Sequence, residues 1–194
     1  VVGPHTGGKT TLLKMIGGQL LPERHRSEGF CLQPVHLRVV HVPQQPMFFC
    51  GTLMENLTFR FSDGEEAIEK LRARVRTICR GLDLDDQVIK LLDCTEQALW
   101  SDSMSQTQLQ LLSIARALLA NPDVLCIHKP TSVLSARKAS LCMGLLHRFV
   151  KERGVALDET AQGSRSRKKT CIYTTDGKTA IDLAEYSDVT FFVS

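Results

Sequence analysis

The chain has 194 residues, 23% of them charged, and a formal net charge of +3. This length suits one α/β domain with a sizeable core, and the scattered, mildly basic charge excludes a dedicated nucleic-acid surface. No apolar run approaches the roughly 18 residues that cross a bilayer, and seven cysteines without a C-x-x-C pair predict reduced thiols, not a disulfide framework or a metal site.

A glycine-rich turn opens the chain. Residues 3–10 have the form G-x-x-x-x-G-K-T, directly after two valines. In such a turn the backbone N–H groups point inward around an anion, Lys9 reaches the outer phosphates, and the hydroxyl of Thr10 is offered to Mg²⁺. The motif therefore predicts a phosphate-binding site at the start of a helix.

Short β-branched runs then alternate with amphipathic stretches, which is typical of a parallel sheet covered by helices. The candidate strands are residues 1–2, 37–42, 124–127, 170–174 and 189–193. The candidate helices are residues 11–16, with Leu12, Leu13 and Ile16 on one face, then 65–80, 85–92, a helix opened by Ser105 and Gln108 at capping-box spacing, 136–151 and 178–186. Residues 154–169 are expected to form a flexible basic loop.

Beyond the first strands, the sequence resembles one family. Residues 42–57, Val-Pro-Gln-Gln-Pro-Met-Phe-Phe and then Gly-Thr-Leu-Met-Glu-Asn-Leu, resemble the Q-loop region of ATP-binding cassette (ABC) transporter domains, especially exporters and multidrug-resistance types. Residues 115–119, 121–123 and 130–132 are similar to the stretch that joins the family's signature helix to its Walker B strand and D-loop. The resemblance covers essentially the whole chain and implies a P-loop NTPase-like α/β fold, a mostly parallel sheet flanked by helices with an inserted helical subdomain.

The resemblance also implies a division of one nucleotide-binding domain over residues 1–194. Residues 1–50 would hold the phosphate loop and the Q-loop, residues 51–120 the helical subdomain, and residues 121–194 the Walker B, D-loop and switch regions. The chain begins without Met, inside the strand expected to lead into the phosphate loop. We therefore expect an N-terminally truncated fragment.

By the same resemblance, the phosphate loop and the Q-loop glutamine bind ATP. Thr6 occupies a position that is usually glycine in the family, so the turn is expected to be tighter or shifted, with partial compensation from Gly7. Thr10 and Gln44 would be the ligands of a weakly bound or dispensable Mg²⁺. The expected ATP-binding residues are Gly3, His5, Thr6, Gly7, Gly8, Lys9, Thr10, Thr11 and Gln44.

The catalytic positions depart from the family pattern. His128 stands where the Walker B aspartate is expected, and a neutral imidazole suits an oxygen-seeking Mg²⁺ poorly. Lys129 replaces the glutamate that activates water, and an ammonium accepts no proton near neutral pH. Asp176 replaces the switch histidine, and Ser135 the D-loop aspartate. Hydrolysis at this site is expected to be impaired.

Alternative interpretations stay open at two of these places. Lys129 and Asp176 are expected to form a salt bridge, with two unrelated surface charges as the alternative and a direct contact of Lys129 with nucleotide as another. The segment Ser105, Gln106, Thr107 and Gln108 stands where the family has Ser-Gly-Gly-Gln. It is either a working signature or only a helix cap.

The implied function is ATP binding that drives export by a membrane transporter. The implied partners are a second nucleotide-binding domain, in a head-to-tail dimer, and transmembrane domains, which would place this segment at the cytosolic face of a membrane without insertion of its own. One alternative is a soluble ABC-like pseudo-ATPase that acts as an interaction scaffold. The other is a competent hydrolase with an unusual base.

Overall fold

The structure is a computed structural model that describes residues 1–4, 6–21, 34–59, 65–157, 167–175 and 183–193. Its centre is a parallel sheet in the order β1-β2-β3. The strands are β1 (Val39–Val42), β2 (Val124–His128) and β3 (Thr170–Thr174), which confirms the three central predicted strands. Val124 pairs with Val39 on one side and with Thr170 on the other, so all three strands end at the same edge of the sheet.

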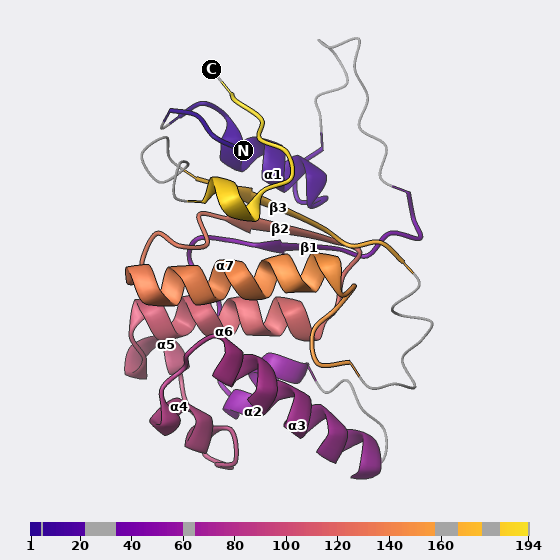
Figure 1. The fold of residues 1–194 in the computed structure, drawn as a ribbon. Coiled ribbons are helices and arrows are strands. Elements are labelled where there is room, and N and C mark those ends of the chain that lie inside the picture. The colour runs from indigo at the N-terminus through magenta and orange to yellow at the C-terminus, as the bar shows by residue number, and fades with distance from the viewer. Residues whose placement is uncertain (5, 22–33, 60–64, 158–166, 176–182, 194) are drawn as a thin grey trace.

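The two outermost predicted strands are wrong as strands. Val2 makes only single parallel bridges, to Thr175 and to Phe192, and residues 189–193 form no ladder. Two residues before the phosphate loop are too few for the repeated hydrogen bonds of a strand pair. The amino-terminal and carboxyl-terminal segments nevertheless meet beside the end of β3, above the sheet in Figure 1.

Helices lie on both faces of the sheet (Figure 1). Helix α1 (Lys9–Ile16) contacts all three strands, while α6 (Gln106–Leu119) contacts β1 and α7 (Ala136–Lys151) contacts β3. The predicted apolar face of α1 is only partly correct. Leu13 is fully buried against the sheet, but Leu12 is 39% exposed. As predicted, glycine ends this helix, where the Gly17 N–H donates to the Leu13 carbonyl.

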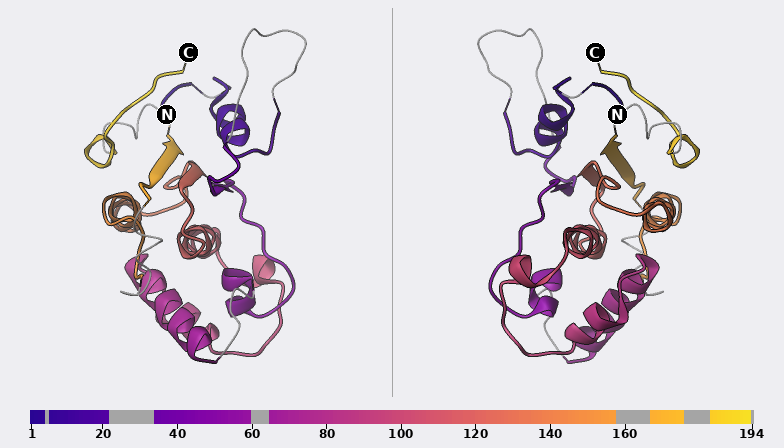
Figure 2. Two further views of the ribbon diagram at one scale, coloured as in Figure 1. Left: turned by 90° about the vertical axis from the view of Figure 1, so that its right-hand side faces the viewer. Right: turned by 90° about the vertical axis from the view of Figure 1, so that its left-hand side faces the viewer.

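The remaining helices pack beyond α6, away from the sheet (Figures 1 and 2). They are α2 (Leu53–Thr58), α3 (Glu65–Gly81), α4 (Asp86–Leu91) and α5 (Trp100–Ser103). Because α6 lies between this group and the sheet, it is buried on nearly all sides and not only on its leucine face. The predicted helices at 65–80, 85–92 and 136–151 are confirmed, with ends that shift by a few residues at most.

The last predicted helix is described only at its end, where η1 (Ala184–Tyr186) is a single 3-10 turn; residues 176–182 lie outside the described part, as do residues 158–166 of the predicted basic loop. In the described ranges, no helix combines the length and the apolar character needed to span a membrane. The described cysteines are free, and burial raises the pKa of the Cys126 thiol to about 11 and that of Cys142 to about 12, which makes both unreactive. Cys50 and Cys94 are exposed.

Candidate phosphate-binding site

The glycine-rich turn forms a closed loop between the Val2 bridge and helix α1. The Gly7 N–H donates to the Pro4 carbonyl (3.1 Å), and the Gly8 N–H donates to the Thr6 carbonyl (2.8 Å). Thr6 and Gly8 have φ angles of 76° and 74°. Thr6 therefore keeps the left-handed backbone that suits glycine, although a β-branched residue there is strained by about 1–2 kcal/mol.

Lys9 is held inside this loop. Its Nζ donates to the carbonyl oxygens of Gly3 and Pro4, at 2.6 Å each, and the residue is only 4% exposed. Gly3 must be glycine, because a Cβ there would lie 2.3 Å from the Val193 carbonyl oxygen. The ammonium is thus fixed within the loop and beside the first turn of α1, whose N-cap makes no side-chain hydrogen bond.

The ends of two strands bring three more side chains to this loop. Gln44 follows β1, His128 ends β2, and Lys129 follows it. Together with the loop they line a cavity of about 240 Å³, whose described walls are Thr6, Gly7, Gly8, Lys9, Thr10, Thr11, Gln44, His128 and Lys129. Such a crevice at the carboxyl edge of a parallel sheet is where α/β proteins bind ligands.

His128 lies between two threonine hydroxyls. Its Nδ1 is 2.8 Å from Oγ1 of Thr174, at the end of β3, and its Nε2 is 3.4 Å from Oγ1 of Thr10. Thr174 is fully buried, and its Oγ1 also accepts the Lys129 backbone N–H at 3.1 Å. Lys129 itself adopts a left-handed backbone, with a φ of 47°. The ends of β2 and β3 are thereby tied together at the cavity wall.

The residues around the cavity do not fit Mg²⁺. This ion takes carboxylate, carbonyl and water oxygens, and here Thr10 and Gln44 supply one hydroxyl and one amide. Lys9, Lys129 and His128 lie beside them, and none of the described lining residues is a carboxylate. The same cationic set does fit a polyanion such as a triphosphate.

The segment at residues 105–108 lies outside this cavity. Ser105 is the N-cap of α6, and it forms a complete capping box with Gln108, which confirms the predicted cap. The hydroxyl of Thr107 donates to the Val133 carbonyl at 2.8 Å, and Gln106 borders a neighbouring hollow of about 520 Å³ that Thr10 and Gln44 also line. Whether this segment acts as a signature stays a prediction.

Of the remaining predicted site residues that the structure describes, Ser135 does not line the cavity. Ser135 is exposed and caps α7, where its Oγ accepts the Lys138 N–H. His5 and Asp176 lie outside the described residues, so the proposed pairing of Lys129 with Asp176 stays a prediction.

Sequence reasoning missed Thr174 as a site residue. It noted residues 174–176 as the switch region but gave the threonine no role, because a threonine at the end of a strand follows no motif. The convergence of three parallel strand ends was the available signal, since it places the last residues of β2 and β3 side by side.

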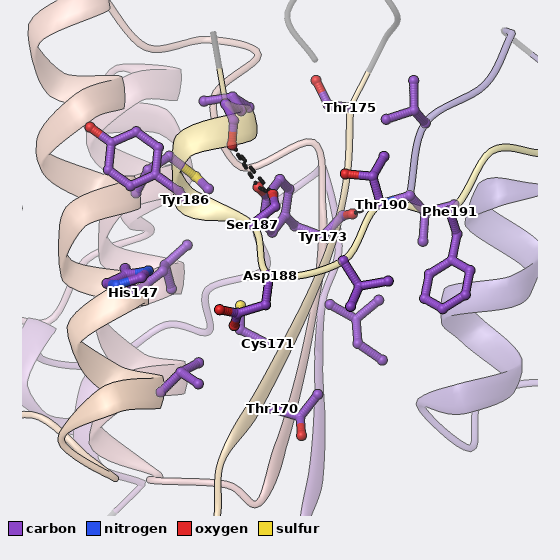
Figure 3. Close-up of a pocket in the computed structure, with 18 of the residues that line it drawn as sticks. His147, Thr170, Cys171, Tyr173, Thr175, Tyr186, Ser187, Asp188, Thr190 and Phe191 are labelled. Carbon is purple, nitrogen blue, oxygen red and sulfur yellow. Dashed lines mark hydrogen bonds between the residues drawn. The ribbon is translucent and has the colours of Figure 1, made fainter. Parts of the chain in front are cut away.

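A second cavity, of about 380 Å³, lies between α7, β3 and residues 187–191 (Figure 3). Its described walls share no residue with the phosphate-loop cavity. Tyr173 crosses it, and its hydroxyl is hydrogen-bonded to Ser187 and to the Leu183 carbonyl. His147 and Asp188 lie at its rim in Figure 3. None of the predicted site residues in the described ranges borders this cavity.

Several known proteins are similar to this chain in sequence. Antigen peptide transporter 2 of Mus musculus is 31% identical over 71% of this chain and 20% of its own length. An ABC transporter of Fusarium pseudograminearum is 25% identical over 87% of the chain and 15% of its own length. The ATP-dependent lipid A-core flippase of Xylella fastidiosa is 26% identical over 79% of the chain. The chain spans 27% or less of the length of these three relatives.

Among solved structures, a dimeric, post-hydrolysis state of the ATP-binding cassette MJ0796 bound to ADP and phosphate superposes with a TM-score of 0.66. The match covers 100% of this chain and 79% of the other at 20% identity, which establishes the predicted α/β fold. A sequence model of the ABC transporter family matches residues 1–132, from the phosphate loop through the end of β2 and the residues after it. The chain therefore belongs to the ABC transporter family.

Proposed function

We propose that this chain is the ATP-binding domain of a transmembrane transporter and that nucleotide binding here drives export of a substrate. The single observation that supports it most is the closed phosphate loop, in which buried Lys9 and the first turn of α1 face one cavity with Gln44 and His128. A peptide transporter and a flippase among the relatives support export.

Hydrolysis by this site is impaired in our proposal. Lys129 stands at the position of the glutamate that activates water in the family, and the described cavity wall holds no carboxylate. Mg²⁺ is weakly bound or dispensable, because the described cavity wall offers it no carboxylate ligand. ATP then acts as a ligand that stabilises one conformation of the domain, and ATP hydrolysis takes place at a partner's site.

The proposed partners are a second nucleotide-binding domain and the membrane-spanning part of the transporter. A dimer is supported by the dimeric state of the structural neighbour and by the exposure of Ser105 and Gln106 at the start of α6. A membrane partner is supported by a groove of about 580 Å³ beside β1 and α6. Met47 and Phe59 are exposed in it, and the Arg116 guanidinium lies over the Phe59 ring, 5.3 Å from its centroid.

These partners would place the domain at the cytosolic face of a membrane. The alternative is a soluble ABC-like pseudo-ATPase that acts as an interaction scaffold. Reading the gene upstream of Val1 separates the two: long apolar segments support the transporter, and a continuous polar stretch supports the scaffold.

The binding proposal is tested by titrating the chain with a fluorescent ATP analogue. Lys9→Ala should weaken binding by about a hundredfold, because it removes a buried cation that faces the phosphates. Lys14→Ala is the matched control, since it removes the same charge from the same helix outside the 240 Å³ cavity, and it should change affinity by less than about twofold. A wild-type chain that binds no nucleotide would overturn the proposal.

The same preparation tests impaired hydrolysis. Wild-type protein should release no phosphate from ATP in a single turnover above the uncatalysed background. Phosphate release that Lys9→Ala abolishes would show instead that this site is a competent hydrolase.

A further inference from the structure

Gln110, in helix α6, carries a buried side-chain amide that has no hydrogen-bond partner among the described residues. The residue is 1% exposed, and the amide could donate two hydrogen bonds and accept two. Leaving such a group unpaired in the interior is costly, whereas an apolar side chain of the same shape carries no such cost. An unpaired buried amide in a native fold therefore indicates a role other than packing.

The spacing of the helix places this amide beside the segment that joins β1 to α2. Residues three or four positions apart lie on the same face of a helix, so Gln110 shares a face with Gln106 and Ser113. Gln106 borders the hollow of about 520 Å³, and Ser113 borders the groove of about 580 Å³. Pro43 borders both. Gln110 therefore lies on the face of α6 that is turned toward residues 43–46.

This segment, residues 43–46, is tied to α6 only at its far end. The Arg116 guanidinium donates to the Met47 carbonyl at 2.9 Å. Among the described residues, no hydrogen bond is found for the backbone of Gln44 or Gln45, and both residues are exposed. Helix α6 thus holds the segment at one point and carries a second group, the Gln110 amide, that could hold it at another.

We propose that Gln110 is a positioning residue for the nucleotide site. In the nucleotide-bound domain, its amide hydrogen-bonds the backbone of residues 43–46 and holds Gln44 at the wall of the 240 Å³ cavity. The inference rests on the proposed nucleotide binding. Because Gln44 lines that cavity together with the phosphate loop, a bound ligand and Gln110 act on the same short segment from two sides. The new hydrogen bonds are the difference in contacts through which the ligand favours this arrangement.

The first test replaces the amide without changing the length of the side chain. Gln110→Met should unfold at a higher urea concentration than wild type, because no buried polar group is left unpaired. It should bind the fluorescent ATP analogue about threefold to tenfold more weakly, since the bound form loses the hydrogen bonds of the amide. A gain in stability with a loss of affinity is a result that a packing role would not produce.

The other outcomes of this test separate the inference from the proposed function. If Gln110→Met binds as wild type does, the inference is wrong and the proposed function stands. If the variant loses stability and affinity together, Gln110 has only a packing role. A wild-type chain that binds no nucleotide would overturn both.

Gln87→Met is the matched control. Gln87 is exposed in α4 and lies outside the described walls of both hollows. The same exchange there should leave the urea midpoint unchanged and alter the affinity by less than about twofold. An equal loss of affinity in both variants would mean that the effect comes from methionine in general and not from the Gln110 amide.

Hydrogen exchange gives a direct readout of the segment. In wild type, saturating ATP should slow the exchange of the Gln44 and Gln45 backbone amides by at least about threefold, because one of them gains the Gln110 oxygen as acceptor and both become less mobile. In Gln110→Met, measured at ATP concentrations that saturate the variant, this slowing should be absent. Wild-type amides that exchange equally fast with and without bound ATP would overturn the inference, whatever the affinities are.

Discussion

The two ends of strand β2 carry opposite kinds of charged groups. At its start, Asp123 is 6% exposed, accepts the Arg38 backbone N–H at 3.1 Å, and lies 3.2 Å from the Nζ of Lys169. At its end, His128 and Lys129 line a cavity whose described walls hold no carboxylate. The strand rises about 3.3 Å per residue, so the two ends lie about 16 Å apart. An acidic group close in sequence is therefore remote in space.

This difference separates a charge that stabilises the fold from charges that serve a ligand. Lys169 also donates to the Asn121 carbonyl, and Arg167 reaches the second oxygen of Asp123 at 3.5 Å, so the start of β2 is a closed ion-pair cluster. The end of β2 instead places His128 and Lys129 at the wall of the 240 Å³ cavity. We expect mutations at the start of β2 to change stability, and mutations at its end to change binding.

The largest effect on stability is expected for Asp123→Asn. It should lower the free energy of unfolding by about 3–5 kcal/mol, because Lys169, whose side chain is 3% exposed, would stay buried without its counter-charge. Urea unfolding measures the change. The double variant Asp123→Asn with Lys169→Met should recover part of the loss, since no unpaired charge remains. A single variant within about 1 kcal/mol of wild type would contradict the stabilising role of this cluster.

Acidic pH should reproduce part of this loss in the free energy of unfolding. Burial alone would raise the pKa of the Asp123 carboxyl, but the Arg38 N–H and the Lys169 and Arg167 cations outweigh it and hold that pKa below the usual value of 3.8. The carboxylate's contribution is therefore complete above pH 3.8 and is lost as the pH falls through the lower folded-state pKa. Urea midpoints of wild type and Asp123→Asn should converge in that acid range. A difference that stays constant there would assign the stability to another group.

The sequence could predict that the phosphate loop and the strand ends come together at one site. The glycine motif fixed the loop, and the alternation of strands with helices placed Gln44 and His128 at one edge of a parallel sheet. These predictions succeeded because they depend on strand direction and chain order, which local patterns encode.

The partners of single side chains could not be predicted in the same way. The contact between Thr174 and His128 joins residues that are 46 positions apart, and the burial of Lys169 depends on the packing around Asp123. The burial of α6 on nearly all sides arises from the helices beyond it, not from its own periodicity. Such features are set by tertiary packing, which overrides local pattern.

A smaller effect is expected at the other end of the sheet, for Thr174→Val. Loss of its hydroxyl leaves the Lys129 N–H and Nδ1 of His128 without this partner, which should lower the free energy of unfolding by about 1–3 kcal/mol. Thr170→Val at the exposed start of β3 should stay within about 0.5 kcal/mol of wild type. Thermal or urea unfolding of the two variants compares them directly. Equal losses would mean that β3 responds to valine in general and not to this hydroxyl.

The smallest effect is expected for Asp188→Asn. This variant tests whether the stabilising effect of Asp123 comes from its burial or from ion pairing alone. Asp188 pairs with Lys151 at 3.2 Å, the same separation as that of Asp123 and Lys169. The side chains of this outer pair are 57% and 70% exposed, however, whereas those of the inner pair are 3% and 6% exposed. Water screens the outer pair, so the free energy of unfolding should change by no more than about 0.5 kcal/mol. A loss as large as that of Asp123→Asn would show that the distance between the charges, and not their burial, decides the stability.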